Sequence, residues 1–384
     1  MRVGAALSTE ANTVQAGTAA AHVVTDALGG APADLALVFA SGDHLAAPDR
    51  ALEAVNTVLE PDALAGCAAG GVLGPGRELE SGTALAVWAA AFEGAGRATP
   101  FHATVADEGL EPAIEGLPDL AGSSGAILLA DPYSFPTDVA LGQLAADAPA
   151  VPVLGGIASA HGPEGPLFLD GELHPDGAVG VRLEGVEMLP CVSQGAAPLG
   201  RELTITAAEG NIVYELAGRP ALETVQQIIS ELSPRERGLV AGGLLIGIVI
   251  DSGKPEYEQG DFLVRGVLGA DPGSGSLAIG ANVRNGQVVR LHARDARSAD
   301  EDLRRALRLQ SEAIAGGTPA GVLLFSCNGR GSAMFGIRDH DAEAVQRELG
   351  GAPAAGFFAA GEIGPVGGRN FLHGFTATLA VFPA

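Results

Sequence analysis

The sequence contains little positive charge. Among its 384 residues, 22 are Lys or Arg and 46 are Asp or Glu, which gives a net charge of −24, and the one lysine is Lys254. A surface of this sign repels nucleic-acid phosphates and anionic lipid headgroups. We therefore expect binding neither to nucleic acid nor to a membrane surface.

Cysteines and long apolar runs are also few. Cys67, Cys191 and Cys327 are an odd number without a C-x-x-C pair, so neither a disulfide framework nor a structural zinc site is expected. The longest apolar stretch, Leu239–Ile250, has about 12 residues, whereas a membrane-spanning helix needs about 20. The N-terminus also lacks the pattern of a secretory signal. These absences predict a cytoplasmic protein.

The remaining composition is typical of a globular protein with a large core. The chain is 47% hydrophobic, has 56 glycines, and is long enough for two to three domains. Runs rich in β-branched residues alternate with runs rich in Ala and Leu. We predict strands at 35–39, 84–92, 126–130, 151–154, 180–183, 203–207, 245–251, 262–268, 288–293, 322–326, 355–358 and 376–382. We predict helices at 13–28, 48–58, 136–146, 221–231, 298–315 (with Ser298 as its N-cap) and 341–349.

Similar strings recur along the chain in the same order, which indicates internal repeats. Positions 65–75 align with 355–365 without a gap, and each segment follows a strand and a helix. A middle copy runs over 128–183, and a fourth, more diverged copy is expected over 211–294. The predicted fold class is therefore α/β (α+β), with two pseudo-repeated halves, 1–197 and 198–384. We expect mixed β-sheets covered by helices, built from strand–helix–strand–Gly-turn–strand units.

Two of the Gly-rich turns carry polar groups that suit a small ligand. In the turn Ser326–Gly331, backbone N–H groups made accessible by glycine would bind an anion, and Arg330 would add a bidentate contact to a carboxylate. Glu362 lies in a second turn whose other residues are small or apolar, where a carboxylate needs a cation or a donor. Arginine on one side and glutamate on the other suit an amino acid or a similar zwitterion. A Glu362–Arg369 or Glu362–Arg330 pair that only holds the turns together is an equal alternative.

The same strings resemble a known family, the FIST domain proteins. Residues 326–331, 356–368, 260–265, 269–272 and 294–296 are similar to its C-terminal part. Residues 66–67, 70–72, 76–78, 129–132 and 155–156 are similar to its N-terminal part. The resemblance covers nearly the whole chain in the right order, and it implies a FIST N-terminal domain at 1–197 and a FIST C-terminal domain at 198–384.

The resemblance implies a stand-alone sensory protein for small, amino-acid-like ligands that acts in signal transduction. The family often adjoins kinase, cyclase or F-box output domains, so an unknown output partner is expected here. The apolar fraction is also compatible with a homo-oligomer. The candidate ligand-binding residues are Ser326, Cys327, Asn328, Arg330, Gly361, Glu362, Arg369, Gly66, Cys67, Gly155 and Gly156.

Two other functions stay open. The first is a Cys-dependent enzyme acting on an amide or a thioester, in which Cys327 or Cys67 would work with Glu362; the thiol would need a nearby cation such as Arg330. The second is a haem-based gas sensor, since some members of the family bind haem. Its axial ligand would be His292 or His373, although only 4% of the residues are aromatic and could line a porphyrin. We predict no cofactor and no metal site, and a binding protein rather than an enzyme.

Overall fold

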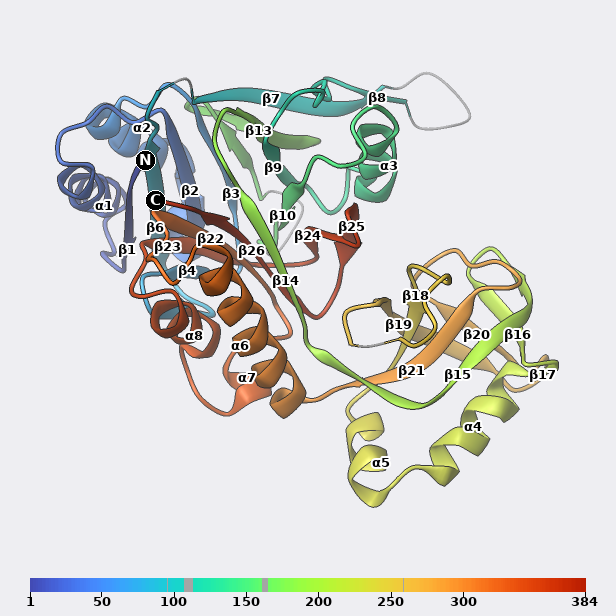
Figure 1. The fold of residues 1–384 in the computed structure, drawn as a ribbon. Coiled ribbons are helices and arrows are strands. Elements are labelled where there is room, and N and C mark those ends of the chain that lie inside the picture. Colours follow the sequence, from blue (N-terminus) through green and yellow to red (C-terminus); the bar gives the residue numbers. More distant parts are fainter. Residues whose placement is uncertain (95, 107–112, 161–164, 258) are drawn as a thin grey trace. The chain divides into compact units, whose positions relative to one another are not determined.

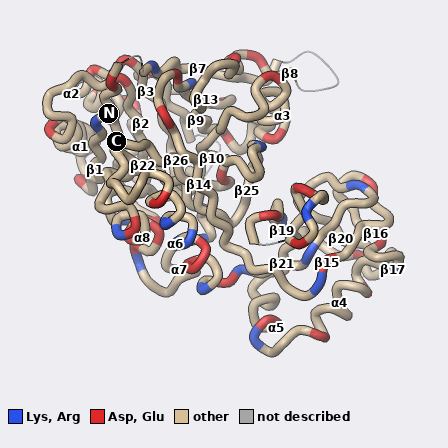
Figure 2. The backbone as a smooth tube through the Cα atoms, in the orientation of Figure 1, with Lys and Arg blue, Asp and Glu red and all other residues tan. Residues whose placement is uncertain are grey.

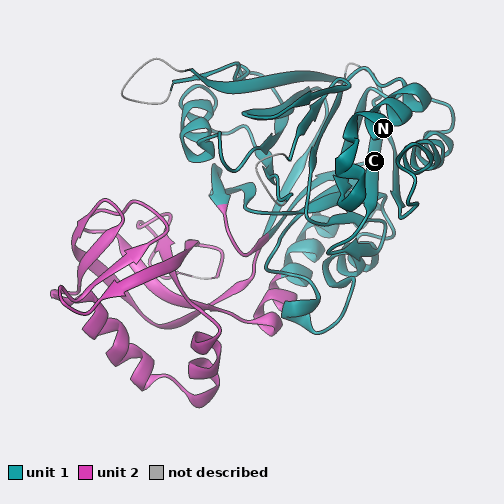
Figure 3. Ribbon diagram, turned by 180° about the vertical axis from the view of Figure 1, so that it is seen from behind, with its two compact units in different colours: residues 1–192, 303–372, 377–384 teal, residues 193–302, 373–376 magenta. Residues whose placement is uncertain are grey.

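The computed structural model describes residues 1–94, 96–106, 113–160, 165–257 and 259–384. Unit 1 comprises 1–192, 303–372 and 377–384, and unit 2 comprises 193–302 and 373–376 (Figure 3). The expected division at 197/198 falls close to the first crossing between the units. However, residues 303–372 and 377–384, from the C-terminal part of the chain, belong to the same compact unit as residues 1–192. Acidic residues are spread over both units (Figure 2).

Unit 1 contains three mixed β-sheets (Figure 1). The first has the order β1 (Arg2–Ser8), β6 (Ala84–Ala91), β2 (Leu35–Ser41), β3 (Leu64–Ala68), β11 (Leu167–Leu169) and β12 (Glu172–His174). The second has the order β25 (Arg369–His373), β24 (Glu362–Val366), β10 (Val153–Ile157), β9 (Gly125–Ala130), β13 (Ala178–Glu184), β7 (Arg97–Ala106) and β8 (Ala113–Glu115). The third has the order β14 (Leu189–Gln194), β26 (Thr376–Phe382), β22 (Gly321–Cys327), β23 (Ala354–Ala359), β4 (Val72–Gly74) and β5 (Arg77–Leu79).

Successive side chains of a strand point to opposite faces of its sheet, and both faces of each sheet are buried. One face of all three sheets contributes to a common core, in which Phe39 stacks on Phe357 and Trp88 packs against Phe382. The opposite faces are covered by helices. These are α1 (Thr13–Leu28), α2 (Pro48–Leu59), α3 (Thr137–Asp147), α6 (Ala296–Ala313) and α8 (His340–Glu348), with the short helices η1 (Gly42–Ala46) and α7 (Ser332–Phe335) in connections. The predicted fold class of mixed sheets covered by helices is confirmed.

The expected strand–helix–strand unit occurs three times in unit 1, as repeat 1 (35–91), repeat 2 (125–184) and repeat 3 (321–382). In each, a helix joins two parallel strands, a short hairpin follows, and an antiparallel strand ends the repeat. The hairpin always joins another repeat's sheet. β4–β5 of repeat 1 extends the sheet of repeat 3, β24–β25 of repeat 3 extends that of repeat 2, and β11–β12 of repeat 2 extends that of repeat 1. The three repeats therefore interlock in a closed cycle.

One glycine in each repeat allows its two parallel strands to pack closely. A Cβ on Gly66, Gly155 or Gly356 would lie 1.9, 1.9 or 1.7 Å from the carbonyl oxygen of a residue on the preceding parallel strand. Because no side chain fits at such distances, these positions require glycine. Gly66, Cys67, Gly155 and Gly156 thus lie within strands β3 and β10, and not in turns as expected from the sequence.

Unit 2 is built differently from the repeats. Its sheet has the order β15 (Ala196–Glu209), β21 (Val288–Arg294), β18 (Leu244–Val249), β19 (Phe262–Asp271), β20 (Ser276–Ile279), β16 (Ile212–Leu216) and β17 (Arg219–Pro220), with helices α4 (Ala221–Glu231) and α5 (Pro234–Ala241). Every pairing between its described strands is antiparallel. The expected fourth copy at 211–294 is therefore wrong, since it lacks the parallel pair that defines the repeat.

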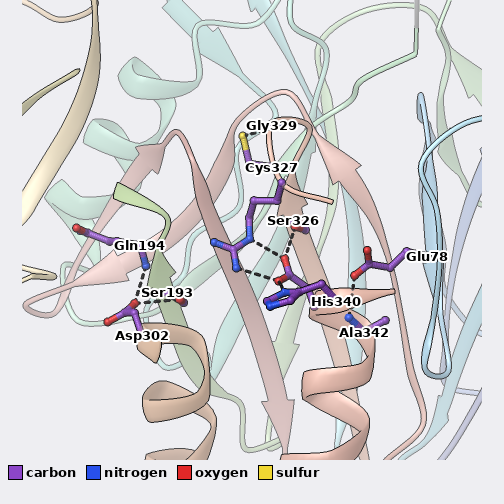
Figure 4. Close-up of polar contacts among 11 residues, drawn as sticks. Glu78, Ser193, Gln194, Asp302, Ser326, Cys327, Gly329, His340 and Ala342 are labelled. Atoms are coloured by element: carbon purple, nitrogen blue, oxygen red, sulfur yellow. Dashed lines mark hydrogen bonds and ion pairs between the residues drawn. The ribbon is translucent and has the colours of Figure 1, made fainter. Parts of the chain in front are cut away.

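Hydrogen bonds within unit 2 connect the segment where the chain enters this unit to the segments where it leaves. Asp302 Oδ2 accepts hydrogen bonds from Ser193 Oγ (2.9 Å) and from the Gln194 N–H (2.8 Å) (Figure 4). The Gly195 N–H donates to the Phe375 carbonyl at 2.7 Å.

The predicted N-cap of α6 was misplaced. The helix begins at Ala296, and Asp295 Oδ1 accepts the Arg297 N–H. Ser298 Oγ instead donates to Gln259.

Candidate functional site

The turn after strand β22 holds a buried arginine. β22 ends at Cys327, and Arg330 follows in the turn that leads to α7, with only 2% of its surface exposed. Its guanidinium binds the Asp341 carboxylate through two hydrogen bonds, Nε to Oδ2 at 2.6 Å and Nη2 to Oδ1 at 2.9 Å. This planar, two-bond geometry fixes the orientation of the guanidinium.

The Asp341 carboxylate collects two further donors. Ser326 Oγ donates to Oδ2 at 2.8 Å, and His340 Nδ1 lies 2.8 Å from Oδ1 (Figure 4). Burial favours the neutral form of Asp341, but the Arg330 charge and these hydrogen bonds outweigh it and hold the carboxyl pKa well below its usual range. Asp341 is therefore ionised at neutral pH and balances the buried arginine.

An aromatic ring covers this ion pair. The rings of Phe335 and His340 are stacked, with centroids 3.4 Å apart and planes inclined by 5°. The Arg330 guanidinium carbon lies 5.1 Å from the centroid of the Phe335 ring, within the range of a cation–π contact. Phe335 comes from the short helix α7, so this helix holds the ring over the arginine.

One guanidinium nitrogen of Arg330 is left without an acceptor. Among the residues that the structure describes, no oxygen or sulfur accepts a hydrogen bond from the buried Nη1. Burial disfavours the charged form, yet the charges of Asp341, Cys327 and Glu362 together raise the arginine pKa. Arg330 is thus a cation with a donor that remains available.

The backbone of the turn differs from the expected anion-binding loop, because three of its N–H groups already have acceptors. Asn328 donates to the Ala359 carbonyl (2.9 Å), Gly329 to Cys327 Sγ (3.4 Å) and Arg330 to the Cys327 carbonyl (2.8 Å). These three donors are therefore engaged, whereas Nη1 of the Arg330 side chain has no acceptor among the described residues.

The hairpin of repeat 1 supports the turn from the other side. Glu80 accepts hydrogen bonds from the Ser332 N–H (2.8 Å) and the Ser332 hydroxyl (2.9 Å). A Cβ on Gly331, whose φ is +90°, would lie 2.8 Å from the Glu80 carboxyl carbon, so glycine is needed there. The Glu78 N–H donates to Asp339 Oδ1 at 2.6 Å, and Glu78 Oε1 accepts the Ala342 N–H at 2.8 Å.

Sequence reasoning missed four of these residues: Asp341, His340, Glu78 and Glu80. Asp341 was visible as the start of a predicted helix, and Glu78 lies in a string that resembles the family. Neither signal indicated that these residues lie near the Arg330 turn, since Glu78 reaches the start of α8 only through the hairpin β4–β5, which joins the sheet of repeat 3.

The predicted residues of the second turn fall into two groups. Glu362 is fully buried at the start of β24, opposite Gly156 on β10, and its charge acts on Arg330. The Gly361 carbonyl accepts the Ile157 N–H at 2.8 Å. A Cβ on Gly156 would lie 3.0 Å from that carbonyl oxygen, so this glycine lets the strand with Glu362 approach. Arg369 is exposed and lies 5.6 Å from the centroid of the Phe371 ring, which places it outside this group.

The three cysteines differ in their surroundings. Cys327 is 8% exposed at the end of β22, and its Sγ accepts the Gly329 N–H. Cys67 is completely buried in the core of unit 1, where burial raises the pKa of its thiol far above the usual range. Cys191 packs in the apolar cluster beneath α6 and α8. Cys67 is therefore a core residue and does not share a polar turn with Cys327.

His292, one of the two candidate haem ligands, lies within the core of unit 2. Its ring is fully buried, and its Nδ1 lies 3.0 Å from the Arg290 carbonyl oxygen. A Cβ at Gly247 would lie 2.3 Å from the ring, and Phe262 packs edge-on with ring centroids 4.9 Å apart, so the imidazole is closely packed on these sides. His373, the other candidate, is also buried at the end of β25. Across the described part of the chain, no group of three or more His, Cys, Asp or Glu is arranged to hold a metal ion.

Comparison with known proteins identifies the family. The FIST N domain matches residues 34–219 and the FIST C domain matches residues 221–365. The chain belongs to the FIST family, whose domains are taken as small-ligand sensory domains in signal transduction. It is 44% identical to the uncharacterized protein Rv0628c of Mycobacterium tuberculosis over 386 residues, which cover 100% of both chains. It is 42% identical to the uncharacterized protein Mb0898c of Mycobacterium bovis over 385 residues, covering 100% of this chain and 99% of that protein. None of the helices in the described residues is long and apolar enough to cross a membrane.

Proposed function

We propose that this FIST protein binds a small, amino-acid-like ligand at the Arg330 turn and passes the signal to a partner protein. The observation that carries the proposal is the buried guanidinium of Arg330, whose Nη1 has no acceptor among the described residues. A buried donor without a partner is unfavourable by about 1–3 kcal/mol, and more for a charged group. A ligand carboxylate would supply the missing acceptor.

The surrounding charges favour a zwitterion over a simple anion. Asp341 already balances the charge of Arg330, and the buried Glu362 adds a further negative charge that acts on the same guanidinium. A ligand with only negative charge would meet Glu362 without compensation. An amino acid carries an ammonium group that Glu362 attracts, while its carboxylate accepts from Arg330 Nη1.

A cytoplasmic setting and a separate output partner are part of the same proposal. The described residues contain no disulfide, which suits a reducing compartment. A ligand that satisfies Arg330 would also act on Phe335 and α7, which contact the arginine directly. We infer that α7 and the exposed Ile337 beside it transmit binding to the partner.

Thermal unfolding across a panel of amino acids and related zwitterions tests this function. A ligand at about 100 times its dissociation constant should stabilise the protein by about 2.7 kcal/mol. Arg330→Lys keeps a positive charge beside Asp341 but removes Nη1, so it should abolish the ligand response, and Glu362→Gln should weaken it. Arg369→Gln, on an exposed residue outside the group, is the matched control and should respond as the parent does. Equal ligand responses of Arg330→Lys, Glu362→Gln and the parent would place the ligand elsewhere.

A further inference from the structure

A second chemistry at the same turn concerns the Cys327 thiol. It stands at the carboxyl end of β22, in a parallel pair with β23, where strands of α/β sheets commonly present reactive groups. Its exposed fraction of 8% compares with 0% for Cys67 and 4% for Cys191. Only a small reagent can reach a thiol with so little exposed surface.

Two features of the turn stabilise negative charge on this sulfur. The Gly329 N–H donates to Sγ at 3.4 Å, and the buried guanidinium of Arg330 would attract the charge of an ionised Cys327. A hydrogen-bond donor and a nearby cation both favour the thiolate, which is the nucleophilic form of cysteine. The buried Nη1 of Arg330, which has no acceptor among the described residues, is a second donor in the same turn.

We propose that Cys327 is a site of reversible oxidation by hydrogen peroxide. The thiolate sulfur attacks one peroxide oxygen, an S–O bond forms, the O–O bond breaks and hydroxide leaves. The cysteine is oxidised to sulfenic acid and the peroxide is reduced. Arg330 Nη1 donates to the departing oxygen and afterwards to the sulfenate oxygen. Two molecules of a small thiol restore the cysteine. The first replaces the sulfenic hydroxyl, forming a mixed disulfide and releasing water, and the second attacks this disulfide, releasing the cysteine thiol and the disulfide of the small thiol. Peroxide is small and uncharged, so it suits this nearly enclosed thiol better than a bulky electrophile.

Trapping of sulfenic acid with dimedone tests the proposal without any other ligand. The protein is treated with peroxide, the peroxide is removed, and dimedone is then added in urea so that it reaches every oxidised cysteine before peptide mass spectrometry. Peroxide-treated parent protein should carry the label on the Cys327 peptide at least about ten-fold above the Cys67 and Cys191 peptides, which serve as internal controls. In urea all three cysteines lose their surroundings. Cys327 should therefore react faster in the folded chain than in the unfolded chain, although it is less exposed when folded.

Arg330→Lys separates activation from mere access. It keeps the charge next to Asp341 but removes Nη1, so the rate of labelling at Cys327 should fall by about ten-fold while circular dichroism stays unchanged. Equal labelling of the three cysteines, or slower reaction of Cys327 in the folded parent than in urea, would overturn the proposal. So would an Arg330→Lys protein that reacts as fast as the parent. The comparison with urea needs no variant, so it remains decisive if Arg330→Lys fails to fold. Because peroxide alone is the probe, failure here leaves the amino-acid response untouched.

Discussion

The strongest perturbation that the structure predicts concerns the buried carboxyl of Glu78. Glu78 lies in β5, is 7% exposed, and places Oε1 against the N-terminus of α8, where the Ala342 N–H donates to it. Burial and, secondly, the negative charge of Asp341 raise the pKa of Glu78 from 4.5 to about 7, although the backbone hydrogen bonds partly oppose them. The folded chain therefore binds this proton more tightly than the unfolded chain does.

The sign and size of the effect follow from linkage. Between pH 4.5 and about 7 the folded protein keeps a proton that the unfolded chain releases, so the free energy of unfolding falls as the pH rises through this interval. Above about pH 7 both states are ionised and the loss is complete. At about 1.4 kcal/mol for each pH unit, the whole loss is about 3 kcal/mol.

Glu78→Gln isolates this contribution. The amide is neutral at every pH and keeps an oxygen that accepts the Ala342 N–H. In urea unfolding at pH 5, 6, 7 and 8, the variant should gain about 3 kcal/mol of stability relative to the parent between the acid and the alkaline end. Glu343→Gln, on the more exposed side of α8, is the control for the substitution itself. A difference between Glu78→Gln and the parent that does not change with pH, or that grows towards low pH, would refute the reasoning.

Two further predictions concern the ion pair and the repeat. Asp341→Asn leaves Arg330 as a buried charge without its counterion, so it should destabilise the fold by about 3–5 kcal/mol in urea unfolding. The control, Glu343→Gln, breaks the exposed pair with Arg347 and should change stability by at most about 1 kcal/mol. Equal effects would show that the buried pair contributes no more than a surface pair. Gly356→Ala places a Cβ 1.7 Å from the Leu324 carbonyl oxygen and should lower the melting temperature or prevent folding. The control, Gly142→Ala, lies in the interior of α3 with open space around it and should be neutral or stabilise the protein by up to about 1 kcal/mol. An unchanged melting temperature for Gly356→Ala would contradict the close packing of β22 and β23.

The sequence allowed the repeated element to be predicted but not its exchange between sheets. Helices α1 and α4 have the predicted bounds, and strand β26 does too, because each has a clear local pattern of apolar residues. The hairpins β4–β5 and β24–β25 have only three to five residues in each strand. Nothing in such short segments specifies which sheet they join, so their partners depend on the packing of the whole of unit 1.

The same limit explains what could be predicted of the candidate site. Arg330 and Glu362 stood out because charged residues in Gly-rich, apolar strings need partners. The partner that Arg330 found is Asp341, 11 positions along the chain, which had been interpreted only as the start of a helix. Glu78 and Glu80 come from repeat 1, more than 250 positions away, and reach the turn because their hairpin is exchanged. Contacts of that range have no local signature in a sequence.

The measurement that tests the central claim most directly is thermal unfolding of the parent, Arg330→Lys and Arg369→Gln across the same panel of amino acids. The account predicts that at least one zwitterion stabilises the parent and Arg369→Gln by about 2.7 kcal/mol near 100 times its dissociation constant, and leaves Arg330→Lys unchanged. A panel in which no amino acid stabilises the parent, or in which Arg330→Lys responds as strongly as the parent, would contradict it.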